Sequence, residues 1–223
     1  MSRDIKAILH IKKYNELFNL FMIAIIIAAM LIMCLVFSTN TSFDTEGLSM
    51  ILAGGIIGGY VGTSMFFKIF FIADEVPRGL TFGMTRKKLF VGCRIVDMLE
   101  ILFFTLVAFA FIKVIGVSMI LKVAVALYGV YMWVEGLAGN SVVRYGKIAY
   151  WVYYFVFLFA VIALPRLGYF IPSFGTPLAL AWDFFINPFF NQGIVWTSIL
   201  VFDLLGLIVN WLTFRKIPVN YAS

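Results

Sequence analysis

Four charged residues lie within or beside apolar segments and are the first candidates for chemistry: Lys68, Asp97, Glu100 and Asp203. A charge inside a bilayer is costly, so it must pair, become neutral or face water. Lys68 can neutralise Asp97 or Glu100 in a structural salt bridge, which we favour over a proton or cation site. Asp203 is about ten residues into the last apolar run, near the bilayer centre, and Lys122 is a possible partner for it.

Recognisable catalytic, cofactor and metal motifs are absent from the sequence. There is no G-x-x-x-x-G-K-[ST] phosphate loop and no H-E-x-x-H, and the one histidine is His10. Cys34 and Cys93 lack the spacing of metal ligands. We therefore predict that this chain is not an enzyme and carries no catalytic, cofactor-binding or metal-binding residues. An ion-coupled secondary transporter and a lipid-modifying membrane enzyme that uses the intramembrane acids stay as alternatives.

The composition indicates a membrane protein. Of the 223 residues, 63% are hydrophobic and 13% are charged, whereas soluble domains have about 45–50% apolar and about 25% charged residues. The apolar runs are about 20 residues long and do not alternate, which favours helices over barrel strands. The net charge of +6 comes from basic residues at the ends of these runs, which indicates membrane topology rather than nucleic-acid binding.

We predict an all-α membrane protein with six transmembrane helices in a single transmembrane domain over residues 1–223. Residues 1–16 are expected to form an amphipathic interfacial helix, and the proline-rich residues 165–192 short re-entrant segments on the outer side. Fourteen of the 17 Lys and Arg residues fall on one side, which places both termini in the cytoplasm of a cell whose plasma membrane holds the chain. The predicted spans are residues 17–37, 48–72, 89–113, 117–137, 148–164 and 193–214.

The second predicted span carries a glycine-rich stretch that can bring helices close together. Its small-xxx-small pairs are typical of helix packing in lipid. A flexible or kinked span is the alternative, since glycine weakens a helix. The glycines concerned are Gly54, Gly55, Gly58, Gly59 and Gly62.

The polar connection over residues 73–88 contains the string LTFGMTRKKLF, residues 80–90. This string resembles the loop between spans two and three of ABC-2 type permeases, the membrane subunits of bacterial ATP-binding-cassette exporters. The predicted layout of six spans with an amphipathic entry helix is also similar to that family. Within that family, the chain resembles small permeases that export amphipathic peptides, such as phenol-soluble modulins, or that confer bacteriocin immunity. An ordinary basic loop is the alternative interpretation.

The resemblance implies a function and a set of partners. The family works as a dimer of six-span permeases, so a second, identical or similar permease subunit is expected in the membrane lipid. Separate ATPase subunits bind ATP and magnesium, so this chain itself needs no cofactor. Residues 73–88 would be the coupling loop that docks on the ATPase, with Glu75, Phe82, Gly83 and Arg86 within it. The substrate would be an amphipathic peptide or a lipid-like molecule, and no nucleic acid is expected as a partner.

Overall fold

A computed structural model describes residues 3–38, 45–110, 117–187 and 189–217 of the chain. Within these ranges every regular element is an α-helix, so the all-α prediction is confirmed for the described residues. The helices are α1 (Arg3–Ser38), α2 (Thr45–Thr81), α3 (Arg86–Ala110), α4 (Val117–Tyr145), α5 (Lys147–Phe170), α6 (Pro172–Ile186) and α7 (Gln192–Phe214).

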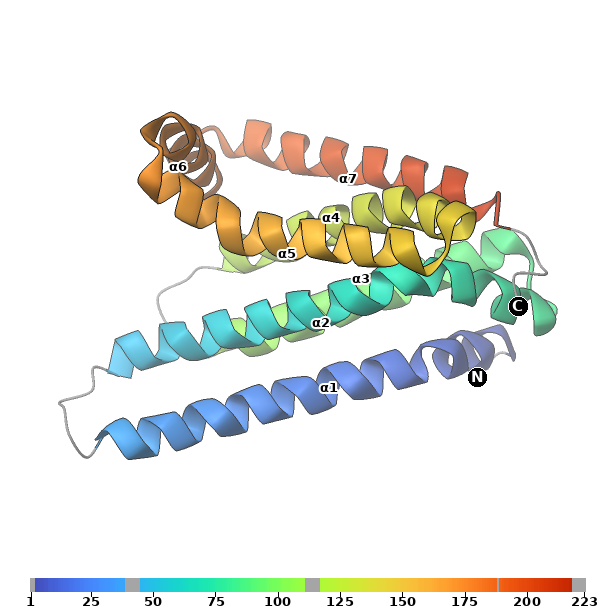
Figure 1. The fold of residues 1–223 in the computed structure, drawn as a ribbon, viewed down its shortest axis with the longest axis horizontal. Coiled ribbons are helices and arrows are strands. Elements are labelled where there is room, and N and C mark those ends of the chain that lie inside the picture. Colours follow the sequence, from blue (N-terminus) through green and yellow to red (C-terminus); the bar gives the residue numbers. More distant parts are fainter. Residues whose placement is uncertain (1–2, 39–44, 111–116, 188, 218–223) are drawn as a thin grey trace.

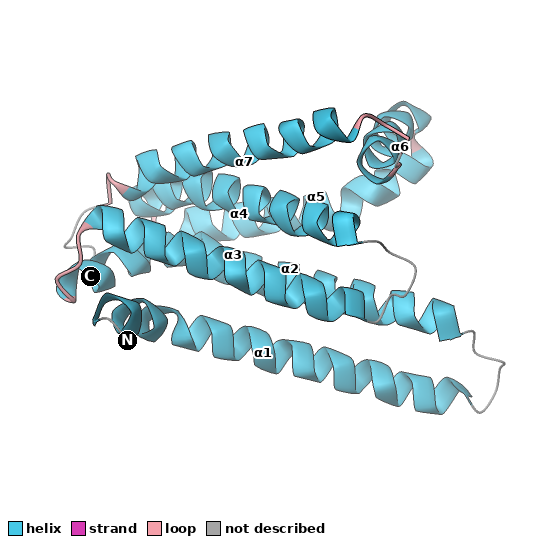
Figure 2. Ribbon diagram, turned by 180° about the vertical axis from the view of Figure 1, so that it is seen from behind, coloured by secondary structure: helices cyan, strands magenta, loops and turns pink. Residues whose placement is uncertain are grey.

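Helices α1 to α5 and α7 run lengthwise between two ends of the molecule, and α6 lies at one of these ends (Figure 1). The opposite end, which we call the terminal end, holds the start of α1, the α2–α3 turn, the α4–α5 turn and the end of α7. Figure 2 shows the same arrangement from behind. The described N- and C-terminal residues therefore lie at the same end of the molecule.

Four helices are long and apolar enough to cross a membrane, within the part of the chain that the structure describes. This supports a membrane protein, but the predicted number of six spans is not confirmed. The first half of α3 carries Arg94, Asp97 and Glu100 beside its three basic starting residues, so the helix is too charged to qualify as a span. In α5 the apolar described stretch covers only Ile148–Ala160. The qualifying segments are Asp4–Met33, Leu52–Ile69, Val117–Ser141 and Gln192–Phe214.

The N-terminal residues continue directly into the first apolar helix. Helix α1 runs without a break from Arg3 to Ser38, so the predicted separate interfacial helix over residues 1–16 is not confirmed. Ile8, Ile11 and Lys12 are buried, because this part of α1 packs against α2 and α3 and contributes to the protein core.

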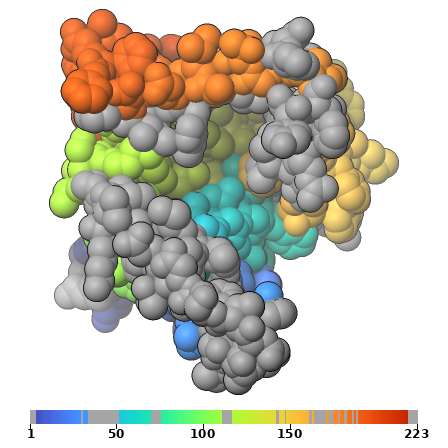
Figure 3. All heavy atoms as spheres, turned by 90° about the vertical axis from the view of Figure 1, so that its left-hand side faces the viewer, coloured from blue at the N-terminus to red at the C-terminus, as the bar shows by residue number. Residues whose placement is uncertain are grey.

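The predicted outer segment, residues 165–192, divides between two helices. Residues 165–170 extend α5, and α6 follows as a separate helix of 15 residues. Ile171 is extended and Pro172 occupies the first turn of α6, a position where the missing proline N–H costs nothing. Figure 3 shows α6, in orange, along one edge of the end face. A helix of this length is too short to cross a bilayer.

The hydrophobic core lies mainly between α2, α3, α4 and α5. Tyr60 of α2 contacts Phe104 of α3 and Tyr131 of α4, with ring centroids 4.5 and 6.2 Å apart. At the terminal end a second cluster gathers around Leu89 of α3 and Phe214 of α7. Buried charged residues of α1, α2, α3 and α4, described below, lie between these two apolar clusters.

Candidate functional site

A network of buried charged side chains joins α1, α2, α3 and α4. Asp97 of α3 lies at its centre and is fully buried. Its Oδ1 accepts hydrogen bonds from the Nζ atoms of Lys12 and Lys68, each at 2.5 Å. Its Oδ2 lies 3.2 Å from the guanidinium of Arg94, one turn earlier on α3. One carboxylate therefore meets three cations from three different helices.

The second carboxylate of the network is Glu135 of α4. It pairs with the guanidinium of Arg94, and its Oε1 lies 3.7 Å from the Nζ of Lys68. The Nδ2 of Asn210 donates to its Oε2 at 3.0 Å, which brings α7 into the network. Arg94 thus bridges Asp97 and Glu135.

The third carboxylate is Glu100 of α3, one turn beyond Asp97. Its Oε1 accepts a hydrogen bond of 2.7 Å from Asn19 Nδ2, and its Oε2 lies 3.9 Å from the Nζ of Lys68. Asn19 also donates to the hydroxyl of Ser64 at 3.1 Å. We call Lys12, Lys68, Arg94, Asp97, Glu100 and Glu135 the ionic network.

The ionic network lies at one depth in the helix bundle. Its members on α1 to α4 are 8 to 14 residues from the ends of their helices at the terminal end, about 12–21 Å along each axis. Every member is at least nine-tenths buried. Buried ions pay a large desolvation cost, which only close partners can offset. The pairing therefore holds these four helices in one register.

Part of this arrangement could be predicted from the sequence. The expected salt bridge from Lys68 to Asp97 or Glu100 is present at 2.5 and 3.9 Å. The contribution of α1 was not predicted, because Lys12 belongs to the residues 1–16 that were expected to form an interfacial helix. A usable signal existed: Lys12, Glu16 and Asn19 recur at spacings of four and three, so polar side chains share one helix face.

Asp203 of α7 lies apart from this network, against α4. It is 6% exposed, and its Oδ1 has no hydrogen-bond partner within the described residues. A Cβ at Gly129 would collide with this oxygen, so the missing side chain there makes room for the carboxylate. Lys122, the partner considered from the sequence, donates instead to the carbonyl of Phe185 at 3.3 Å.

Helices α4 and α7 approach closely along a seam of small residues. A Cβ at Gly136 would come within 2.9 Å of the backbone nitrogen of Asn210, and one at Gly206 within 2.9 Å of the Trp133 ring. Together with Gly129, these glycines let the two backbones meet. The hydroxyl of Thr213 donates to the carbonyl of Gly136 at 2.7 Å.

The glycines of α2 that were predicted to pack are mostly open. A Cβ at Gly54, Gly58 or Gly62 would meet nothing within 4 Å among the described residues. Gly59 differs, because a Cβ there would collide with Ile26 of α1, and Gly55 is half-buried. Among the described residues, the Gly59 flank of the predicted glycine face is the part that contacts another helix.

The predicted coupling loop, residues 73–88, is mostly helical: residues 73–81 end α2, residues 82–85 form a tight turn, and residues 86–88 begin α3. Gly83 has a φ of 75° and donates to the carbonyl of Leu80, while Met84 donates to that of Gly79. This pattern is a Schellman motif, which ends helices with a glycine in the left-handed region. The hydroxyl of Thr85 then accepts from the backbone N–H of Lys88 at 3.4 Å, as expected of a helix N-cap.

The other predicted members of this loop have separate positions. Arg86 donates to the carbonyls of Phe214 and Arg215, at 3.3 and 2.8 Å, so it caps the C-terminus of α7. Phe82 is 42% exposed and contacts the ring of His10 edge-on. Glu75 belongs to α2, and its side chain lies outside the described residues. Phe82 and Arg86 therefore contact different helices, α1 and α7.

The carboxylates of the ionic network are occupied to different degrees by cations. Two of the three carboxylates of the ionic network are held by cations at short range. No group of three or more metal-ligating side chains occurs among the described residues. No family model, curated protein or solved structure matches this chain.

Proposed function

We propose that this chain is the transmembrane permease subunit of an ATP-driven ABC exporter. It would move an amphipathic or hydrophobic substrate, such as a peptide or a lipid-like molecule, out of the cell. The observation that carries this proposal is the α2–α3 turn, where the string that resembles the family's coupling loop lies at the terminal end. Its residues Gly83, Thr85 and Arg86 each have a defined structural role there.

The length of α2 supports a docking role for this turn. With 37 residues the helix is about 56 Å long, whereas the hydrocarbon core is about 30 Å thick. The α2–α3 turn and the start of α3 can therefore project beyond the lipid and present exposed side chains, including Phe82, Lys87 and Lys88. A separate ATPase subunit in the cytoplasm would dock on this surface and bind ATP, and both termini would lie on the same side.

The open glycine face of α2 supports a second permease subunit. Gly54, Gly58 and Gly62 recur every four residues and contact nothing in the described chain. Small residues at this spacing let two helices approach closely in lipid. In this proposal they form part of the contact between two permease subunits around a substrate pathway.

One observation favours a second candidate function, an ion-coupled secondary transporter. The buried Oδ1 of Asp203 has no hydrogen-bond partner among the described residues, as in an acid that binds a transported proton or cation. ATP-independent transport that the Asp203→Asn substitution abolishes would favour this candidate. The ion-paired Asp97 and Glu135 give less support to a membrane enzyme that uses acidic residues.

The exporter proposal is tested by purifying the tagged chain in mild detergent and assaying the eluate for an ATPase subunit. Phe82→Ala removes an exposed ring from the turn, and we expect it to reduce ATPase recovery at least fivefold. Phe189→Ala is the matched control, because Phe189 is 95% exposed and follows α6 at the opposite end. Arg86 is unsuitable, since its loss would also uncap α7.

An ATPase that is retained by wild type and Phe189→Ala but lost from Phe82→Ala supports the proposal. No ATPase with wild type in any of several detergents contradicts the exporter. Equal recovery with both variants contradicts the docking role of the turn.

A further inference from the structure

A basic depression lies on an exposed flank of α1 near the terminal end. Lys6 and Lys13 are seven residues apart, so they share one face of the helix, and both line the depression. Both side chains are exposed, and neither forms an ion pair with another described residue. Leu9, Leu17 and Leu20 line the same depression. Two cations that are not balanced within the described chain are therefore presented beside apolar side chains.

Glu16, the one acidic side chain of this depression, does not cancel its charge. It is half-buried with its Oε1 enclosed, and its electrostatic partners include Lys12, Lys68 and Glu100 of the ionic network. The carboxyl group therefore lies on the inner side of the depression. Even an ionised Glu16 balances only one of the two lysines, so the depression attracts anions.

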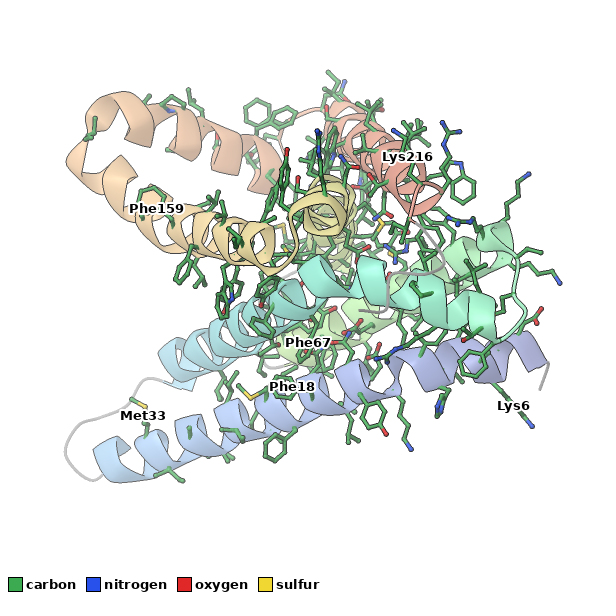
Figure 4. The ribbon with its side chains drawn as sticks, turned by 45° about the vertical axis from the view of Figure 1, so that its right-hand side comes forward. Lys6, Phe18, Met33, Phe67, Phe159 and Lys216 are labelled. Atoms are coloured by element: carbon green, nitrogen blue, oxygen red, sulfur yellow. The ribbon has the colours of Figure 1, made fainter. Side chains whose placement is uncertain are left out.

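An apolar groove of about 820 Å³ adjoins the basic depression and shares Leu17 and Leu20 with it. This volume is typical of ligand sites. One wall is formed by Phe18 of α1 and Phe67 of α2, which point toward each other (Figure 4) with ring centroids 4.9 Å apart. The two shared leucines are 61% and 49% exposed, so the groove is open to the surroundings of α1. The other side chains that line it are Tyr14, Asn15 and Phe21.

The junction between the depression and the groove lies where a lipid layer would begin. Residues 17–37 of α1 carry no charge. As a helix these 21 residues measure about 31 Å, close to the ~30 Å of a hydrocarbon core. Lys6 and Lys13 therefore lie on the headgroup side of this boundary, and the groove lies on the hydrocarbon side. The headgroup and an acyl chain of one lipid can reach both parts at once.

We propose that the basic depression and the adjoining groove bind one anionic phospholipid. The ammonium groups of Lys6 and Lys13 donate charge-assisted hydrogen bonds to its phosphate and headgroup, and an acyl chain fills the groove between Leu17 and Phe67. Lys13 precedes Leu17 by one helical turn, so the two parts of the site are adjacent.

A second copy of the chain is the rival occupant of this face. A symmetric contact here would bring the lysines of both copies together, and their repulsion opposes such a contact, whereas a phosphate relieves it. The lipid therefore fits the charge better. The proposal goes beyond the exporter function, because it concerns the isolated chain and requires neither an ATPase nor transport.

Native mass spectrometry of the purified full-length chain in a non-ionic detergent measures the binding. The probes are phosphatidylglycerol and phosphatidylcholine with identical acyl chains, and glycerol phosphate as a headgroup without chains. We expect phosphatidylglycerol to bind at least about tenfold more tightly than phosphatidylcholine, and glycerol phosphate to bind more weakly than phosphatidylglycerol. Equal affinity for the two lipids would overturn the proposal, and so would glycerol phosphate that binds as tightly as phosphatidylglycerol.

A pair of variants distinguishes this site from general attraction to the basic end of the molecule. Lys13→Gln is expected to weaken phosphatidylglycerol binding about fivefold, as for one lysine near an anionic headgroup. Lys216→Gln is the matched control, because Lys216 is exposed at the same end but on the opposite side of the bundle from Lys6 (Figure 4). Equal losses in the two variants would refute a site on α1.

A photoreactive phosphatidylglycerol with a diazirine in its acyl chain locates the groove in the wild-type protein, in discs of phosphatidylcholine. On irradiation the diazirine loses N₂, and the resulting carbene inserts into a bond of a neighbouring side chain. We expect crosslinks within residues 14–21 that unlabelled phosphatidylglycerol displaces and phosphatidylcholine does not. Crosslinks spread evenly over the helices would contradict the proposal. Crosslinks at residues 14–21 that occur in the monomer and disappear in a dimer would assign the face to a second copy instead.

Discussion

At the scale of single residues, the central feature is one carboxylate on α3 that forms ion pairs with side chains of α1 and α2. Asp97 accepts hydrogen bonds from Lys12 of α1 and Lys68 of α2 while it also meets Arg94 on its own helix. A buried ion pair adds little stability compared with a well-packed apolar pair, but removing one partner leaves charges buried and unpaired. The network therefore specifies how the helices are aligned more than it strengthens their packing.

Replacing this carboxylate should be strongly destabilising. We expect Asp97→Asn to lower the free energy of unfolding by about 3–5 kcal/mol, since two lysines would then face a neutral amide. Thermal unfolding of the purified chain in detergent measures the change. Adding Lys12→Met to Asp97→Asn should recover part of the loss, because the double variant buries one cation fewer.

The exposed Asp183→Asn is the control and should leave the unfolding temperature unchanged. An Asp97→Asn protein as stable as wild type would show that these charges are solvated rather than buried.

Sequence reasoning reached some of these residues and not others, for physical reasons. Lys68 and Asp97 could be matched because each needs a counter-charge within a membrane segment. Lys12 lies outside the uncharged run of its helix, so its burial depends on α3 covering it, which no local pattern reveals. Arg86 looked like a docking residue, whereas its partners are main-chain carbonyls 128 and 129 positions away. A main-chain carbonyl can belong to any residue type. The sequence therefore does not reveal the partner of a side chain that binds the backbone.

At the scale of helices, the closest contacts occur where a glycine of one helix faces a larger residue of the other. The glycine-rich run of α2 has the familiar spacing of four, yet most of that face is open. The tight seam joins α4 to α7 through Gly129, Gly136 and Gly206. Glycines seven residues apart on one helix form no recognised motif, because the spacing becomes meaningful only when the partner helix is known.

This contrast predicts opposite effects of one substitution at two sites. Gly136→Ala places a methyl group 2.9 Å from the Asn210 backbone, so α4 and α7 must separate; we expect a loss of about 1–3 kcal/mol. Gly54→Ala meets open space and should be neutral or stabilising by about 0.5–1 kcal/mol, since alanine favours helix. Thermal unfolding of both variants checks the pair, and a larger loss at Gly54 would contradict the packing described for α4 and α7.

At the scale of the whole molecule, long helices and a short one combine in one bundle. Helices α1 and α2 contain 36 and 37 residues, more than a bilayer requires, while α6 contains only 15. The all-helical membrane architecture follows from composition alone. The number of spans does not, because the charges of α3 become tolerable only when α1, α2 and α4 supply their partners.

The open face of α2 leads to a prediction about assembly. If Gly54, Gly58 and Gly62 contact a second subunit, Gly58→Leu should shift the protein from dimer toward monomer without lowering its unfolding temperature. Crosslinking in lipid discs, combined with mass measurement, reports the ratio. Ala110→Leu, at an exposed small residue of α3, is the matched control. A dimer that persists in Gly58→Leu would place the subunit contact elsewhere.

The hydrogen bonds of Arg86 have a mechanical consequence. They tie the first residue of α3 to the carbonyls at the end of α7, beside the contacts of the Phe90 ring with Trp211 and Phe214. A force applied to the α2–α3 turn would therefore act on α7 directly through these hydrogen bonds. Helix α7 in turn packs closely against α4 at Gly129, Gly136 and Gly206. A displacement of the turn would therefore act on two parts of the bundle. It would reach the ionic network through α3, and it would reach the α4–α7 pair through the hydrogen bonds of Arg86.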